Sequence, residues 1–425
     1  MNIWSKKIIT AMRKNKGELL FLSTRYSAPF IGLICNFFVL KYISPEELGI
    51  IQTVSLIPSY LGFLNLGVFA GLGRNFPYYL AQEQKEKAQL IVDAGWSFSK
   101  IRSLVGSIVT ICVVTYFVII GATSDYLWAT FIIAGLLVFD PLQTYQLRIY
   151  LGSQNYHRLG VLMTIHNLIT IILGLLPALF GVIGLIIRRT LDPVIKFLLM
   201  LYDPPAKPAN KGQWREVLEL SKVGMPILIT GIILSYQNIA DRSVIAIFLG
   251  TDAVGNYALS GIISTVAIFL PASLGMLLYP KGAAKYGQTK SSRSLRRFYW
   301  TSLILNILLI VPFCLVVYFY IGPIVEIFFP KYIEGIAAAK ISALGSIFFI
   351  SMGSGNIIPI VRRNLPYQLA IGFSLGLTWA LGFLFIQKGF GIVGAAWARL
   401  FANAVLCMFT LIYSYYLTTI NIREE

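Results

Sequence analysis

The chain has 425 residues, of which 57% are hydrophobic and only 12% are charged, and its formal net charge is +17. Soluble domains carry about 25% charged residues, so the composition excludes an ordinary soluble protein. Apolar runs of roughly 20 residues recur from end to end, and each is long enough to cross a bilayer core. They do not alternate apolar and polar residues, which argues against a membrane β-barrel. The expected fold is an all-α polytopic membrane protein.

Twelve transmembrane helices are expected, and the loops on one side hold most of the basic residues. By the positive-inside rule this bias places both termini in the cytoplasm, and it explains the net charge without a nucleic-acid partner. The four cysteines lie in apolar runs without the spacing of a metal site or redox pair, so no metal or cofactor is expected. The expected spans are 18–41, 47–71, 95–121, 126–150, 158–180, 182–202, 222–248, 256–280, 298–320, 335–361, 367–387 and 390–418.

The two halves of the chain share short motifs. Residues 180–184 read FGVIG and residues 390–394 read FGIVG, an offset of 210 that places Arg189 over Arg399. The starts of the halves also match, with Gly49 over Gly255. Two parallel repeats of six helices are typical of transporters whose site lies between the halves. We therefore expect six-helix bundles at 1–202 and 222–425, joined by a cytoplasmic linker at 203–221 that is rich in Pro and Lys.

The sixth expected helix carries charges inside an apolar run, GVIGLIIRRTLDPVI (181–195). Spacings of three and four residues place Arg189, Asp192 and Lys196 on one helical face, and Arg188 is spaced to pair with Asp192. A charge at membrane depth costs about 3 kcal/mol or more, so such residues are usually paired or functional. Two interpretations remain open. The stripe either fixes helix packing, with arginines that reach the interface, or it lines a substrate cavity.

Acidic residues and a histidine also fall at membrane depth. Asp140 on the fourth helix has no basic neighbour along its own helix, so it either pairs across helices or carries a coupling proton. Asp241 on the seventh helix adjoins Arg242. His166 on the fifth is either a proton site or a packed, hydrogen-bonded residue. We treat Asp140, Asp192 and Asp241 as candidates for ion coupling or charge pairing.

The balance of these charges predicts the sign of the substrate. A cavity that collected the intramembrane bases and acids would be net positive, and arginine forks match phosphate oxygens. The sequence therefore predicts an anionic, phosphate-bearing substrate held by Arg25, Arg188, Arg189 and Arg399. The bases are Arg25, Arg188, Arg189, Lys196, Arg242 and Arg399, and the acids are Asp140, Asp192 and Asp241.

Two longer stretches carry a family resemblance. The first is YISPEELGIIQTVSLIPSYLGFLNLGVFAGLGRNFPYYLAQ (42–82), with its Pro-Glu turn, Gly49 and the LGxxxGLGR pattern. The second is GMPILITGIILSYQNIADRSVIAIFLGTDAVGNYALSG (224–261), with Gly224, Pro226 and Asp241. Both resemble Wzx-type O-antigen and capsule flippases, the polysaccharide exporters of the multidrug/oligosaccharidyl-lipid/polysaccharide (MOP) flippase superfamily.

The resemblance implies a MATE-like, V-shaped pair of six-helix bundles in the bacterial inner membrane. It implies alternating-access transfer of an undecaprenyl-diphosphate-linked oligosaccharide from the cytoplasmic to the outer leaflet. The expected partners are that lipid-linked glycan, membrane lipids, and the polysaccharide polymerase and chain-length proteins. The doubled Arg188–Arg189 followed by Asp192 matches no motif of the family.

Three alternatives are less well supported by the residues. An ion-coupled multidrug antiporter of the MATE type would need acidic cavity residues, which are few. A peptidoglycan-precursor flippase would usually have fourteen helices. A membrane glycosyltransferase or polysaccharide polymerase would often carry paired acids, but the chain has no Asp-x-Asp or Glu-x-Glu, and it has no P-loop motif. We therefore expect a transporter rather than an enzyme.

Overall fold

The structure is a computed structural model that describes residues 16–209 and 212–420. By their packing the helices form two compact units. Unit 1 comprises residues 1–43 and 54–232, and unit 2 comprises residues 44–53 and 233–425. The expected bundles at 1–202 and 222–425 are instead defined along the chain, and that division stays a prediction.

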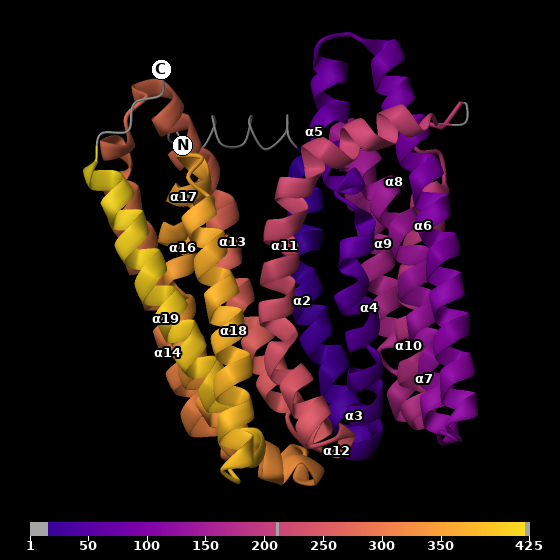
Figure 1. The fold of residues 1–425 in the computed structure, drawn as a ribbon, viewed down its shortest axis with the longest axis vertical. Helices are drawn as coiled ribbons and strands as arrows, with labels where there is room; N and C mark the ends of the chain where they lie inside the picture. Colours follow the sequence, from indigo (N-terminus) through magenta and orange to yellow (C-terminus); the bar gives the residue numbers. More distant parts are fainter. Residues whose placement is uncertain (1–15, 210–211, 421–425) are drawn as a thin grey trace, which may run out of the picture. The chain divides into compact units, whose positions relative to one another are not determined.

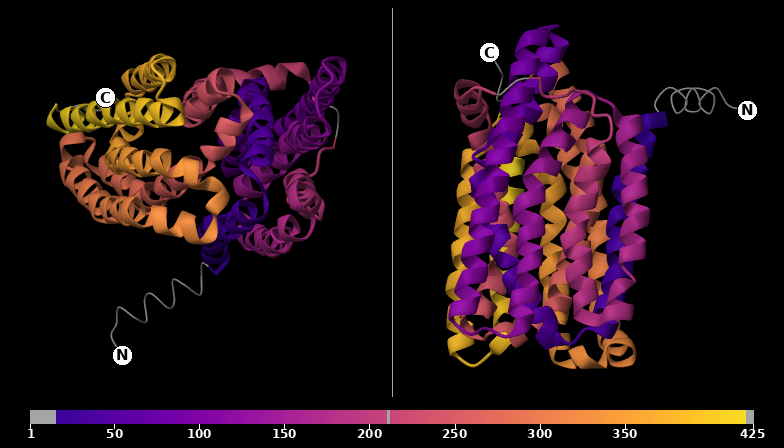
Figure 2. Two further views of the ribbon diagram at one scale, coloured as in Figure 1. Left: turned by 90° about the horizontal axis from the view of Figure 1, so that it is seen from below. Right: turned by 90° about the vertical axis from the view of Figure 1, so that its right-hand side faces the viewer.

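Unit 1 is a bundle in which α10 packs against α2, α7, α8 and α9, while α6 packs against α5, α7 and α8. Figure 2 (right) shows its long helices running along a common direction. Its elements are α2 (Lys16–Tyr42), α4 (Leu56–Tyr60), η1 (Leu61–Asn65), α5 (Val68–Ala81), α6 (Lys85–Ile119), α7 (Ser124–Ala134), the π-helical turn η2 (Gly135–Phe139), α8 (Asp140–Gly152), α9 (Tyr156–Leu173) and α10 (Leu176–Leu201).

Unit 2 is built around α15 and α19, with α19 also packed along α18 (Figure 1). It includes most of α3 (Pro45–Val54), although that helix comes early in the chain. Its other elements are α12 (Thr251–Asn256), α13 (Ala258–Thr289), η3 (Ser292–Leu295), α14 (Arg296–Phe328), η4 (Pro330–Gly335), α15 (Ile336–Ser346), η5 (Ile347–Ile350), α16 (Ser351–Gly355), α17 (Ile357–Ile360), α18 (Leu365–Gln387) and α19 (Gly391–Thr419).

Helix α11 (Trp214–Phe248) belongs to both units, because the boundary falls between Ile232 and Ile233. It contains Pro226, which cannot donate a backbone hydrogen bond. The hydroxyl of Thr230 donates to the Pro226 carbonyl at 3.2 Å. One continuous helix thus leads from the first unit to the second.

The all-α membrane fold is confirmed. Ten helical stretches among the described residues are long and apolar enough to cross a membrane. The other two expected spans correspond to α2, which has 27 residues, and α10, which has 26 and carries Arg188, Arg189, Asp192 and Lys196. Helices suit this environment because they satisfy their backbone polar groups internally.

The boundary between the fifth and sixth spans differs from the expected one. We expect the fifth span to end at 180, but α9 ends at Leu173 and α10 already begins at Leu176. Gly181 has non-helical backbone angles, φ 55° and ψ −134°, so a kink there separates the short first part of α10 from its long part, which follows near the expected start at 182. Gly391, its counterpart at the offset of 210, has φ 54° at the start of α19. The two motifs therefore share a backbone geometry that favours glycine, which supports the repeat.

The matched glycines near the starts of the two halves lie against each other in unit 2. A β carbon on Gly49 would lie 2.0 Å from the Thr251 carbonyl oxygen, and one on Gly255 would lie 1.7 Å from the Pro45 carbonyl oxygen. Only glycine permits this approach of α3 to α12. A capping box fixes the start of α3, because Ser44 N donates to Glu47 at 2.9 Å and Glu47 N donates to the Ser44 hydroxyl at 3.3 Å.

Candidate functional site

A polar pocket of about 360 Å³ opens beside α10 in unit 1. Arg188, Arg189 and Asp192 line it from α10, together with Gln143 from α8. Arg189 Nη1 donates to the hydroxyl of Ser55 at 3.3 Å, so the guanidinium is oriented across the pocket wall. These groups tolerate their place in an apolar helix because they face a cavity rather than lipid.

Unit 1 has a second pocket, of about 280 Å³. The second pocket is lined by Arg25 from α2, His166 from α9 and Lys196 from α10. His166 Nε2 lies 3.3 Å from Asp192 Oδ1, which suits an ion pair when the imidazole is protonated, although the two groups do not have hydrogen-bond geometry. The acid and the histidine thus link the lining of one pocket to the lining of the other.

Asp140 lies close to these pockets at the first residue of α8, directly after the π-helical turn η2. Gln143 Nε2 donates to Asp140 Oδ1 at 2.6 Å, so Gln143 holds the carboxylate with its amide nitrogen while it also lines the first pocket. Lys196 and Arg102 are the bases that act electrostatically on Asp140. A π-helical turn within an α-helix frequently marks a functional site.

The two pockets of unit 1 together have an excess of positive charge. Their linings contain four bases, Arg25, Arg188, Arg189 and Lys196, but only one acid, Asp192. A planar guanidinium offers paired donors that match two oxygens of a phosphate or carboxylate. The linings can therefore hold an anion with several charged oxygens.

The charges of unit 2 are arranged differently. Arg399 Nη1 lies 2.6 Å from Asp241 Oδ2, and the two residues are only 5% and 2% exposed. The Tyr257 hydroxyl donates to the same carboxylate oxygen at 2.8 Å, and Arg399 also donates to the Asn238 carbonyl at 3.3 Å. This network ties α11 to α19 and neutralises Arg399. The guanidinium therefore faces a protein carboxylate, not a pocket with excess charge.

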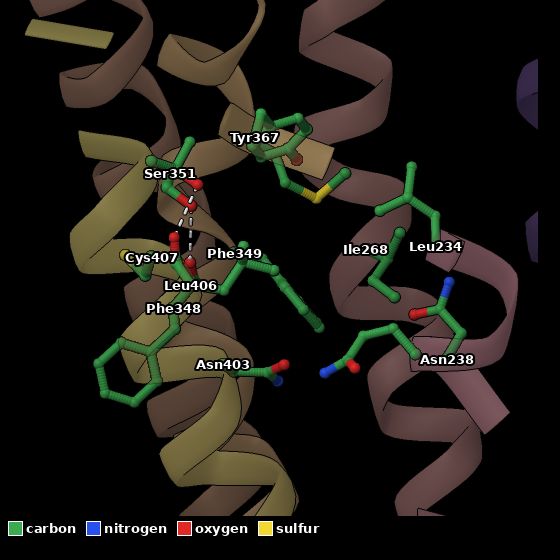
Figure 3. Close-up of a pocket in the computed structure, with 13 residues that line it drawn as sticks. Leu234, Asn238, Ile268, Phe348, Phe349, Ser351, Tyr367, Asn403, Leu406 and Cys407 are labelled. Atoms are coloured by element: carbon green, nitrogen blue, oxygen red, sulfur yellow. Dashed lines mark hydrogen bonds between the residues drawn. The ribbon is translucent and has the colours of Figure 1, made fainter. Parts of the chain in front are cut away.

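A smaller pocket of unit 2, about 90 Å³, lies next to this ion pair. Figure 3 shows Asn403 and Phe349 on one side of it, facing Leu234, Asn238 and Ile268 on the other. Its lining is uncharged, in contrast to the linings in unit 1.

The structure thus places Arg25 in one pocket of unit 1 and Arg188, Arg189 and Asp192 in the other, with Asp140 close by. It places Arg399 and Asp241 together in a separate, closed pair. The role of each residue in substrate binding or ion coupling stays a prediction.

Sequence reasoning missed Ser55 and Arg102. Ser55 lines the first pocket, and an isolated serine gives no signal. Arg102 lies near the start of the expected span 95–121, where a base is typical of the cytoplasmic boundary of a membrane helix. In the structure Arg102 is 5% exposed within α6. Its proximity to Asp140 could be seen only once the packing of α6 on α8 was known.

The fold is that of the MOP-superfamily transporters. A MOP superfamily transporter from Pyrococcus furiosus superposes with a TM-score of 0.66 at 15% identity, over 95% of this chain and 94% of that one. A multidrug resistance MATE family transporter is similar in its inward-facing conformation (TM-score 0.64, 16% identity, 95% and 98% covered). An outward-facing conformation of such a transporter gives 0.64 at 14% identity, with 95% and 96% covered.

The sequence itself identifies the family. Residues 40–337 match the model of the polysaccharide biosynthesis protein family. The chain belongs to this family, and it is a multi-pass membrane protein with a transporter fold. No curated protein matches the sequence.

Proposed function

We propose that the protein is a flippase that moves a polyprenyl-diphosphate-linked oligosaccharide from the cytoplasmic to the outer leaflet by alternating access. The observation that supports this proposal is the excess of positive charge in the linings of the two pockets of unit 1. A diphosphate carries several anionic oxygens, and arginine forks bind such oxygens bidentately. Membership of the polysaccharide biosynthesis family makes a glycan on that diphosphate the fitting cargo.

The charge of the pockets also distinguishes this function from the alternatives. A carrier of cationic drugs would need acids that outnumber bases. The two linings instead contain four bases and a single acid, Asp192. The transporter fold and the family favour transport over sugar transfer or polymerisation. We place the protein in the bacterial inner membrane with both termini in the cytoplasm, where the lipid-linked substrate is made, and we expect polymerase and chain-length proteins as its functional partners.

The test follows lipid-linked glycan in cells that lack the gene. We expect complete units to accumulate on the cytoplasmic face, and surface glycan to be lost. Wild-type protein should restore export, and Arg189→Ala at equal abundance should not. Arg215→Ala is a matched control, because this arginine has an 84% exposed side chain outside the pockets. If units reach the outer leaflet normally and only their polymerisation fails, the flippase proposal is wrong.

A further inference from the structure

The small pocket of unit 2 has the chemistry of a site for an uncharged, hydroxyl-rich ligand. Three amide side chains, Gln237, Asn238 and Asn403, reach it from α11 and α19. An amide offers both donors and an acceptor, which is the pattern that a ring of hydroxyl groups requires. Phe349 and Tyr367 add aromatic surface, against which the apolar C–H face of a sugar ring can pack.

Gln237 shows that the pocket has an unused polar group. Its side chain is only 6% exposed, and its amide nitrogen donates to Ser374 at 3.0 Å and to Thr378 at 3.3 Å. These bonds fix the orientation of the amide, while its oxygen Oε1 is buried without a hydrogen-bond partner in the described part of the chain. A buried polar atom without a partner costs about 1–3 kcal/mol, and a ligand hydroxyl would recover this cost after a shift of the Gln237 side chain that exposes Oε1.

Asn403 presents a second amide that is weakly engaged. It is 8% exposed, and its nitrogen reaches only the Gly345 carbonyl, at 3.5 Å. It lies one helical turn after Arg399, whose charge is neutralised by Asp241 at 2.6 Å. No charged residue lines the pocket, so it suits an uncharged ligand better than a phosphate.

We infer that this pocket binds part of an uncharged sugar ring of the transported glycan. The inference rests on the proposed function, and it assigns the neutral part of the substrate to unit 2, separately from the diphosphate. A volume of about 90 Å³ is well below the roughly 300–1,000 Å³ of pockets that enclose a whole ligand. The pocket thus accepts one edge of a single ring, while the rest of the glycan lies outside it.

The test measures how much the glycan adds to the affinity of the lipid. Full-length protein in lipid nanodiscs is titrated with the lipid-diphosphate oligosaccharide extracted from cells that lack the gene, and with undecaprenyl diphosphate alone. For wild type we expect the glycan to tighten binding by roughly tenfold or more. Asn403→Leu should reduce this ratio by about two- to tenfold, the worth of one uncharged hydrogen bond, and should leave the affinity for undecaprenyl diphosphate within about twofold.

Two further variants keep the result interpretable. Asn238→Leu changes an exposed pocket amide and serves if Asn403→Leu does not fold, and Gln387→Leu is a control for an exposed amide at the end of α18, outside the pocket. Equal affinity of wild type for both lipids, or an unchanged ratio in both pocket variants, would overturn the glycan site. Failure of wild type to bind either lipid would instead overturn the proposed function.

Discussion

Arg189 in unit 1 and Arg399 in unit 2 hold matching places in the two repeats, 210 residues apart, but their surroundings differ. Arg189 donates to the neutral hydroxyl of Ser55 and lines a pocket where bases outnumber acids. Arg399 is buried against Asp241 at 2.6 Å. The arginine of one unit is therefore part of a buried ion pair, and its counterpart in the other unit lines a basic pocket. The two arginines differ in their surroundings and not in residue type.

The largest effect is expected from breaking the pair in unit 2. Arg399→Ala leaves Asp241 buried without its partner, and such a change costs about 3–5 kcal/mol of unfolding free energy. Thermal unfolding in detergent measures this loss against Arg189→Ala, which should cost less, about 1 kcal/mol, because Arg189 is only partly buried and lines a pocket. Equal destabilisation by the two variants would remove the distinction between the repeats.

A slightly smaller effect is expected on ligand affinity when arginines of unit 1 are removed. Arg188→Ala and Arg189→Ala each remove charged donors from the pocket of unit 1, and a hydrogen bond to a charged group contributes about 1.5–3 kcal/mol. We therefore expect binding of undecaprenyl diphosphate to weaken about 10- to 100-fold. Titration in nanodiscs measures this. Unchanged affinity in both variants, at native thermal stability, would show that these arginines only pack.

The next largest effect is a loss of stability where the matched glycines bring α3 and α12 together. Gly49→Ala would place a β carbon 2.0 Å from the Thr251 carbonyl oxygen, and the backbone shift that this requires should cost about 1–3 kcal/mol. Gly62→Ala is the control, since no atom lies within 4 Å of its added carbon. Chemical or thermal unfolding compares the two. Equal stability of both variants would mean that α3 and α12 separate without cost.

The smallest effect is expected from salt, which should weaken binding to the pockets of unit 1 but not binding to the pocket of unit 2. Raising ionic strength from about 0.01 M to 0.15 M shortens the screening length from about 30 Å to 8 Å. Binding of undecaprenyl diphosphate to wild type should weaken, because the pockets of unit 1 are basic. The ratio by which the glycan tightens binding should not change, because the pocket of unit 2 is uncharged. A ratio that falls with salt would show that charge contributes to glycan recognition.

Much of the fold was predictable from the sequence, because apolar runs of membrane-spanning length dictate helices. The charged run on α10 also pointed to its pocket, since no lipid-facing helix carries Arg188, Arg189 and Asp192 cheaply. The pairing of Asp241 with Arg399 was not predictable, because 158 residues separate them. The meeting of Asp192 with His166 likewise required the packing of α9 on α10. The early end of α9 was missed because Gly181 is equally consistent with a break and a kink.

The proline in α11 has a consequence for how this helix bends. Its residues up to 232 pack with unit 1 and those beyond pack with unit 2, and Pro226 lies shortly before this boundary. No atom lies within 4 Å of a β carbon built on Gly231, and a helix bends most readily where proline removes a backbone bond. The bending stiffness of α11 at this point is thus set by a few hydrogen bonds within one helix rather than by the length of a loop.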